Sequence, residues 1–154
     1  MTDSRINEIY KYQKVDEKLS TAGQPTEEQI ESIKREGFDV VINLALHNVQ
    51  RYSLPDEAGL VKSYGMKYIH IPVEFDSPQE SDLLRFFDAM QDNSDKKIFV
   101  HCAANMRVSA FLALYNPIRL CEPDENAFSL MKSIWLPDEV WTQFISAMLE
   151  KYRK

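Results

Sequence analysis

Cysteine, glycine and histidine are scarce in this chain, and the shortages exclude several classes of protein. Two cysteines, Cys102 and Cys121, cannot form a disulfide framework. The three histidines have no spacing with one another, with cysteines or with paired carboxylates that would suit a metal site. The chain also has no internal repeat, low-complexity segment or linker that would divide it into domains. We therefore expect a single domain with no metal and no cofactor.

Long apolar runs and blocks of basic residues are also missing. No apolar run approaches the length of a membrane span, and the first 20 residues have no secretory core. The formal net charge is -6, and no segment concentrates lysine and arginine. Nucleic acid and an anionic membrane surface are therefore not expected as partners. The expected location is cytoplasmic, unless a secretory signal has been removed.

What is present is the pattern of a globular α/β domain. The chain has 154 residues, of which 44% are hydrophobic and 27% are charged, enough to bury one proper core. Helices are expected over residues 27–36, 55–64, 81–91, 106–116, 124–134 and 137–152. Strands are expected over residues 39–46, 67–71 and 98–100, and a short strand or turn over residues 19–23. This alternation predicts a mainly parallel central sheet flanked by helices. Residues 1–18 would form an entry arm with room for a short helix, residues 19–115 the core, and residues 116–154 the C-terminal helices.

Residues 97–111 organise the rest of the chain. Ile98, Phe99 and Val100 have the character of a strand covered on both faces. A tight loop begins at Cys102, and a helix begins near Arg107. The N–H groups of such a loop and the positive end of the helix dipole form an anion site. The same field favours a thiolate over a thiol, so we predict that Cys102 is a nucleophile.

The order His101-Cys102, a short loop, Arg107 and then Ser109 resembles the signature of the cysteine-dependent protein tyrosine and dual-specificity phosphatases, in which His-Cys precedes five residues, Arg, and Ser or Thr. Residues 20–25, 40–44 and 68–73 are similar to segments of an uncharacterised bacterial branch of that superfamily, the β-lactamase-hydrolase-like phosphatases. The resemblance covers about residues 19–115. It implies a dual-specificity-phosphatase-like fold and a metal-free phosphate monoester hydrolase that works through a phosphocysteine. The implied partner is a phosphorylated substrate, with phosphoprotein, nucleotide, inositide and small metabolite all open.

The resemblance also implies a role for each residue of this stretch. Cys102 would attack phosphorus, Arg107 would hold two phosphoryl oxygens, and Ser109 would stabilise the leaving thiolate. His101 would order the loop. The residues implied to surround the phosphate are Ala103, Ala104, Asn105, Met106, Arg107 and Val108.

A general acid is also required, and the family takes an aspartate from a separate loop. Glu74 and Asp76 are the two candidates, because both follow the strand expected at residues 67–71. The alternative for either is an ordinary solvated loop carboxylate or the cap of the next helix.

The spacing from Cys102 to Arg107 is one residue shorter than in the family. If the loop keeps the family's length, Asn105 takes a position where glycine is usual and Val108 takes the arginine position. Asparagine suits this alignment because it tolerates left-handed backbone better than other non-glycine residues. If the loop is one residue shorter, Arg107 takes the arginine's role. Both alignments remain open at this stage.

Two other functions fit the same stretch. Rhodanese-like sulfurtransferases resemble the strand, cysteine, loop and helix arrangement with a shorter loop, and there Cys102 would carry a persulfide. The second is a catalytically weak phosphate-binding or regulatory module that kept the anion site alone. The structural alternatives are a buried core cysteine at Cys102, an ion-paired arginine at Arg107 and a back-bonded serine at Ser109.

Overall fold

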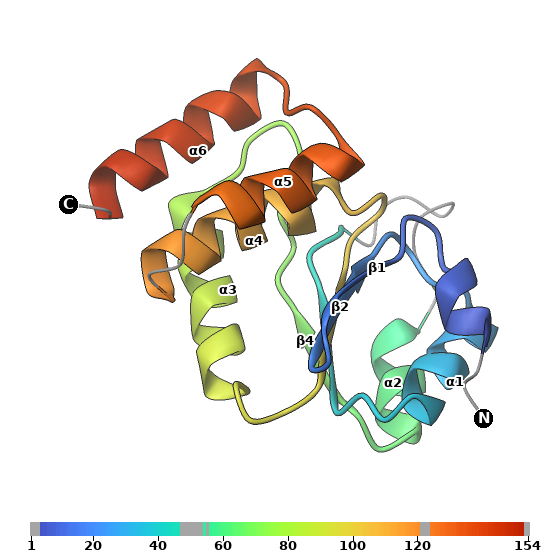
Figure 1. The fold of residues 1–154 in the computed structure, drawn as a ribbon. Helices are drawn as coiled ribbons and strands as arrows, with labels where there is room; N and C mark the ends of the chain where they lie inside the picture. The colour runs from blue at the N-terminus through green and yellow to red at the C-terminus, as the bar shows by residue number, and fades with distance from the viewer. Residues whose placement is uncertain (1–3, 47–53, 55, 121–123, 153–154) are drawn as a thin grey trace.

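A five-stranded sheet lies between two layers of helices in the computed structural model, which describes residues 4–46, 54, 56–120 and 124–152 (Figure 1). The strand order is β1-β2-β5-β3-β4. β1 pairs antiparallel with β2, and all other pairs are parallel. The predicted α/β class with a mainly parallel sheet is therefore confirmed, and β5 is its central strand.

The strands fall where the sequence predicts them, with one addition. Their bounds are β1 Gln13–Asp16, β2 Leu19–Ala22, β3 Val40–Asn43, β4 Lys67–His70 and β5 Ile98–His101. The addition is β1, inside the expected entry arm. It is a mostly polar strand at the edge of the sheet, with half-buried and exposed residues in alternation. Such edge strands carry little of the apolar pattern that identifies a strand in a sequence.

The helices also follow the predictions closely. Their bounds are η1 Ser4–Glu8, which is a 3-10 helix, then α1 Glu27–Arg35, α2 Glu57–Ser63, α3 Glu80–Asp92, α4 Met106–Arg119, α5 Asp124–Ile134 and α6 Glu139–Tyr152. Thr26 and Gln29 form a capping box at the start of α1. The sequence predicted that α4 ends or bends at Pro117, but the helix runs through it to Arg119. Proline removes only one backbone donor there, and burial along most of α4 holds the last turn in place.

Two hydrophobic clusters lie on the two faces of the sheet. One packs η1, α1 and α2 against the sheet, and the other packs α3 to α6 against the opposite face (Figure 1). Phe99 of β5 belongs to the first cluster, while Ile98 and Val100 belong to the second. Residues alternate between the two faces along a strand, so neighbouring side chains at the end of β5 point to opposite layers. Cys102 belongs to the cluster of α3 to α6.

The predicted apolar stripe of the last helix packs on this same core. Trp141, Ile145 and Met148 are buried, and Phe144 and Leu149 lie against them. The C-terminal helix therefore covers part of the domain's own core. No helix of the part of the chain described here is both long and apolar enough to cross a membrane.

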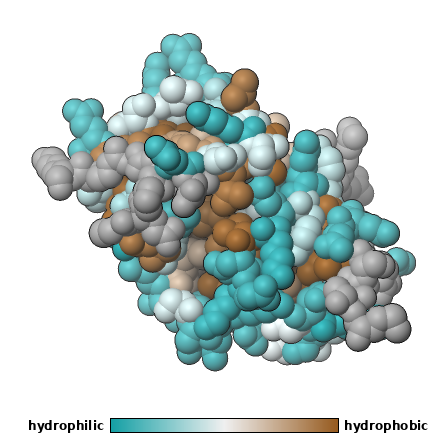
Figure 2. Space-filling view, viewed as in Figure 1, coloured by the Kyte–Doolittle hydropathy of each residue, from teal (hydrophilic) through white to brown (hydrophobic). Residues whose placement is uncertain are grey.

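A groove of about 670 Å³ opens at the start of β5, at the end of the strand away from Cys102. Its apolar lining comes from the β1–β2 hairpin, β5, α3, α5, and α4 with the residue that follows it. The lining residues are Val15, Leu19, Met90, Ile98, Tyr115, Leu120 and Leu130. Figure 2 shows apolar side chains at the centre of this face, surrounded by hydrophilic ones.

Candidate active site

The connection from β5 to α4 turns sharply at Asn105. This residue has φ 63 and ψ 6, in the left-handed region, and it precedes the first residue of α4. Its buried side chain donates hydrogen bonds of 3.0 Å to the carbonyl of Lys11 and to Oγ1 of Thr21. Asparagine tolerates this backbone at lower cost than other non-glycine residues. The turn is thereby attached to the β1–β2 side of the domain.

Several backbone donors of this connection have no acceptor among the residues that the structure describes. The N–H groups of Ala103, Met106, Arg107 and Val108 make no hydrogen bond to another described residue. Three of them belong to the first turn of α4, which contains no acidic residue. Free N–H groups at the positive end of a 14-residue helix favour a bound anion. The connection therefore has the donors that a phosphoryl group requires.

Cys102 lies directly behind these donors and is fully buried. Its N–H donates to the carbonyl of Ala22 over 3.3 Å, which continues the pairing of β5 with β2. The carbonyl of the next residue, Ala103, accepts from Gln24 N over 3.0 Å. Full burial is equally what a structural core cysteine would have, so the position of Cys102 agrees with a nucleophile without requiring one.

Arg107 lies in the first turn of α4 and faces the loop that follows β4. Its Nη1 donates to the carbonyl of Val73 over 2.8 Å, and its guanidinium carbon lies 5.8 Å from the centre of the Phe75 ring. The buried Nε has no hydrogen-bond partner among the described residues. Val108, the other candidate for the arginine position, is fully buried in the core. Of the two candidates, Arg107 therefore supplies the positive charge in this region, together with an Nε–H group that has no partner among the described residues.

The loop between β4 and α3 carries both candidate acids. Glu74 and Asp76 are exposed, and neither side chain bonds to another described residue. Phe75 between them packs on Trp135 and Trp141, and its carbonyl accepts from Nε1 of Trp141 over 2.8 Å. The loop backbone is thus attached to α4 and α6, while both carboxylates stay in solvent.

The hydroxyl of Ser109 makes two hydrogen bonds within the layer of helices α3 to α6. Its Oγ donates to the carbonyl of Met106 over 3.0 Å and accepts from Nε1 of Trp135 over 3.1 Å. This is the back-bonded serine that the sequence left open. Stabilisation of the Cys102 thiolate by Ser109 stays a prediction. It requires the Ser109 hydroxyl to rotate away from the Met106 carbonyl.

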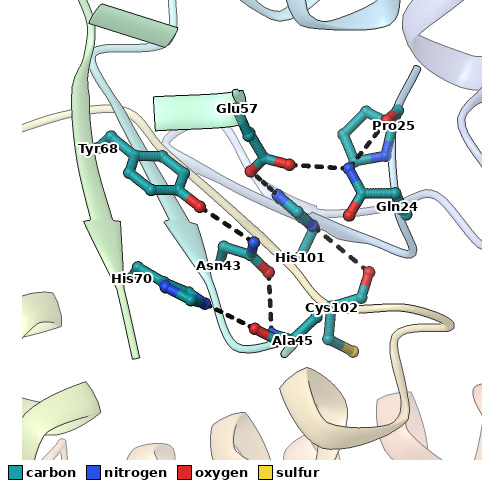
Figure 3. Close-up of polar contacts among 9 residues, drawn as sticks. All are labelled: Gln24, Pro25, Asn43, Ala45, Glu57, Tyr68, His70, His101 and Cys102. Carbon is teal, nitrogen blue, oxygen red and sulfur yellow. Dashed lines mark hydrogen bonds and ion pairs between the residues drawn. The ribbon is translucent and has the colours of Figure 1, made fainter. Parts of the chain in front are cut away.

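A buried pair of residues supports the loop from the other face of the sheet (Figure 3). Nε2 of His101 lies 2.6 Å from Oε2 of Glu57, and both side chains are fully buried. Nδ1 of His101 lies 3.4 Å from the carbonyl oxygen of Cys102. The other carboxylate oxygen of Glu57 accepts from Nε2 of Gln24 over 2.8 Å. The histidine that the sequence implied as loop support therefore joins α2 to the cysteine.

Sequence reasoning did not find Glu57 or its neighbours. An acidic residue in the first turn of a helix is ordinary, so nothing in the pattern marked Glu57. Beside it, Tyr68 accepts from Nδ2 of Asn43 over 3.1 Å. Burial, followed by the negative charge of Glu57, raises the pKa of the Tyr68 hydroxyl above its ordinary value. The Asn43 and Tyr68 pair thus extends the network along the ends of β3 and β4.

No cluster of three or more histidine, cysteine or acidic residues in the described part of the chain could hold a metal ion. His70 instead lies with Nε2 at 2.7 Å from the carbonyl oxygen of Ala45. His47 and Cys121 lie outside the described residues.

Comparison with known families identifies the fold. Residues 2–134 match the model of a family described as "DSP-PTPase phosphatase fused to NAD+ Kinase". The crystal structure of a DUF442 protein from Shewanella putrefaciens CN-32 is 34% identical, with a TM-score of 0.87 over 97% of this chain and 99% of that one. No curated protein matches the sequence significantly.

More distant structures share the fold alone. Tk-PTP in its active form is 17% identical, with a TM-score of 0.76 over 92% of this chain and 97% of that one. TpbA of P. aeruginosa in complex with pTyr is 15% identical, with a TM-score of 0.68 over 96% of this chain and 85% of that one. The predicted dual-specificity-phosphatase-like fold is confirmed, and so is the resemblance to the cysteine-dependent phosphatase superfamily.

Proposed function

Because the chain belongs to the DSP-PTPase phosphatase family, we propose that it hydrolyses phosphate monoesters through a phosphocysteine on Cys102. The observation that carries this proposal is the group of four N–H donors without an acceptor among the described residues, together with the Arg107 side chain. The four belong to Ala103, Met106, Arg107 and Val108. Such donors bind the equatorial oxygens of a phosphoryl group and stabilise their charge while the group is transferred. The substrate is a phosphorylated molecule, and the cytoplasm is its proposed location.

The proposed reaction has two steps. The Cys102 thiolate attacks phosphorus in line, so that an S–P bond forms while the ester P–O bond breaks. Glu74 or Asp76 gives a proton to the leaving oxygen. Water then attacks the phosphocysteine and gives a proton to the same carboxylate. The S–P bond breaks, inorganic phosphate leaves and the thiolate is restored.

Hydrolysis of a generic aryl phosphate between pH 5 and 8, without added metal, tests this proposal. The wild-type protein is compared with Cys102→Ser and with Cys121→Ser as the matched cysteine control. We expect turnover in the wild type and in Cys121→Ser and none in Cys102→Ser. A phosphocysteine trapped by acid quench and located on Cys102 by mass spectrometry would identify the intermediate. Equal turnover in Cys102→Ser would overturn the proposal.

The full burial of Cys102 favours a second candidate, a phosphate-binding module that does not turn over. Inorganic phosphate would then bind and protect Cys102 from alkylation, while no ester is cleaved at any pH. The sulfurtransferase alternative receives no support from the similar families and structures.

A further inference from the structure

The groove at the start of β5 has the size of a small-molecule site. Its volume is about 670 Å³, and sites for small molecules usually occupy about 300–1,000 Å³. Most of its walls are apolar, and Leu120 among them is 46% exposed. Figure 2 shows apolar side chains gathered at the centre of this face. A molecule with an apolar body would therefore remove exposed hydrocarbon from water when it entered the groove.

Tyr115 is a buried residue of this groove whose hydroxyl has no partner. The residue is 5% exposed, and its ring centre lies 6.2 Å from that of Phe86 and 5.6 Å from that of Phe87. Tyr115 lines the groove, and its hydroxyl makes no hydrogen bond to another described residue. Buried tyrosine hydroxyls usually have a hydrogen-bond partner, because an unpaired buried polar group is costly. A polar group of a bound molecule would supply the partner.

The charged side chains of the groove favour an anion. Asp16 accepts from the Lys18 N–H over 2.8 Å, and Glu17 accepts from Nζ of Lys14 over 3.2 Å. The ammonium groups of Lys18 and Lys96 also belong to the lining, and they have no partner among the described residues. Both carboxylates of the lining are therefore paired, while two cations are not. Charge complementarity selects a negatively charged ligand.

The two lysines lie at the same end of the sheet. The carbonyl oxygen of Lys18 accepts from Ile98 N over 2.8 Å, which joins the β1–β2 hairpin to the start of β5. Lys96 precedes Ile98 by two residues. One anionic group at this end of the groove can therefore interact with both lysines.

We propose that the groove binds a small amphipathic anion, with its apolar body against the groove walls and its anionic group at Lys18 and Lys96. The hydroxyl of Tyr115 donates a hydrogen bond to an oxygen of the same molecule. The groove and Cys102 lie at opposite ends of β5, so this proposal does not depend on the proposed phosphatase function.

Decanoate is the probe, and calorimetric titration of the full chain measures its affinity. Decanol lacks the charge, and butyrate lacks most of the apolar body. We expect decanoate to bind at a single site and butyrate to bind about tenfold or more weakly, because each buried methylene adds affinity. Decanol should also bind more weakly than decanoate. Equal affinities for decanoate and decanol, or for decanoate and butyrate, would overturn the proposal.

A double lysine variant tests the anionic end of the groove. In Lys18→Gln/Lys96→Gln the affinity for decanoate should fall about 3- to 30-fold, because two exposed ion pairs are lost, while the affinity for decanol should stay the same. Lys62→Gln/Lys67→Gln is the matched control, since both of its lysines are exposed and lie outside the groove. An equal loss in the two double variants would mean that net charge alone attracts decanoate, and would overturn the proposal.

Tyr115→Phe tests the unpartnered hydroxyl. The variant keeps the ring that packs on α3, so urea denaturation should give at least the wild-type stability. The affinity for decanoate should fall about 2- to 10-fold, because one hydrogen bond to the ligand is lost. Wild-type affinity for decanoate in Tyr115→Phe would show that this hydroxyl does not contact the ligand.

Methyl NMR of Met90 locates the bound molecule, because this residue is 5% exposed and lines the groove. A Met90→Leu variant assigns the signal, and decanoate should shift it in the wild-type protein. Binding of decanoate without this shift would place the ligand elsewhere and overturn the proposal. A Met90 shift that depends on protein concentration without decanoate would mean that a second copy of the chain occupies the groove, which would also overturn it.

Discussion

Arg107 donates a hydrogen bond of 2.8 Å from Nη1 to the carbonyl oxygen of Val73. This contact joins the first turn of α4 to the loop that carries Glu74 and Asp76. The cation proposed to hold phosphate and the carboxylates proposed to move protons are therefore parts of one connected unit. The Nε of Arg107 is buried and has no hydrogen-bond partner among the described residues. This N–H group is therefore available to donate to a bound phosphoryl oxygen.

Replacement of Arg107 by lysine should reduce turnover strongly. Lysine keeps the charge but lacks the planar fork that binds two oxygens, and loss of one donor to transition-state charge typically lowers kcat by about 10²–10³. Steady-state hydrolysis of an aryl phosphate measures the effect. Arg85→Lys is the matched control, because Arg85 is an exposed residue of α3 that pairs with Asp82. Wild-type kcat in Arg107→Lys would show that the arginine does not act on the phosphoryl group.

Glu74→Gln and Asp76→Asn should differ from each other. The general acid matters most when the leaving group is poor, so its amide variant should lose about 10²–10⁴ in kcat on an alkyl phosphate and far less on an activated aryl phosphate. The other variant should behave like the wild type on both substrates. Neither change should alter thermal stability, because both carboxylates are exposed. If both variants keep wild-type rates on both esters, the proton donor does not come from this loop.

Gly23→Ala should displace the loop that is proposed to bind phosphate. A methyl group at Gly23 would lie 2.5 Å from the carbonyl oxygen of Ala103 and 2.8 Å from the Tyr10 ring. Overpacking of this kind costs about 1–3 kcal/mol of unfolding free energy. Because Ala103 is a loop residue, affinity for inorganic phosphate should fall as well. Urea denaturation and calorimetric titration measure the two effects.

Gly37→Ala is the control for Gly23→Ala. Gly37 has φ +90 with no atom within 4 Å of the new methyl, so the change should cost roughly 1–2 kcal/mol in strain and leave phosphate binding intact. If Gly23→Ala binds phosphate as tightly as Gly37→Ala does, contact with Gly23 does not position the loop.

Asn105→Ala should destabilise the protein more than Asn105→Gly. Both variants lose the hydrogen bonds to Lys11 and Thr21, worth about 1 kcal/mol each. Alanine pays a further cost of about 1–2 kcal/mol for left-handed backbone, which glycine avoids. Free energies of unfolding from urea titrations give the difference. Equal values for the two variants would mean that the turn rearranges when the side chain is removed.

The sequence predicted most of the fold because its local signals agree with one another. The capping pattern at Thr26 marked the start of α1, and the apolar run around Val100 marked the central strand. β1 was not predicted because a polar edge strand forms through pairing with β2, and its own residues show no strand pattern. Of the two effects predicted for Pro117, an end or a bend of the helix, the end does not occur, because buried contacts outweigh a local preference.

Within the candidate site, the sequence by itself determined the order of the chemical groups: a cysteine after a buried strand, a turn at Asn105 and an arginine at the start of a helix. The tertiary structure alone decided which partners these groups meet. It placed Val108 in the core, brought Val73 to Arg107, and set Glu57 against His101 across 44 residues of chain. Such pairs arise from the crossover connections of a parallel sheet, which bring distant segments together without any periodic signal in the sequence.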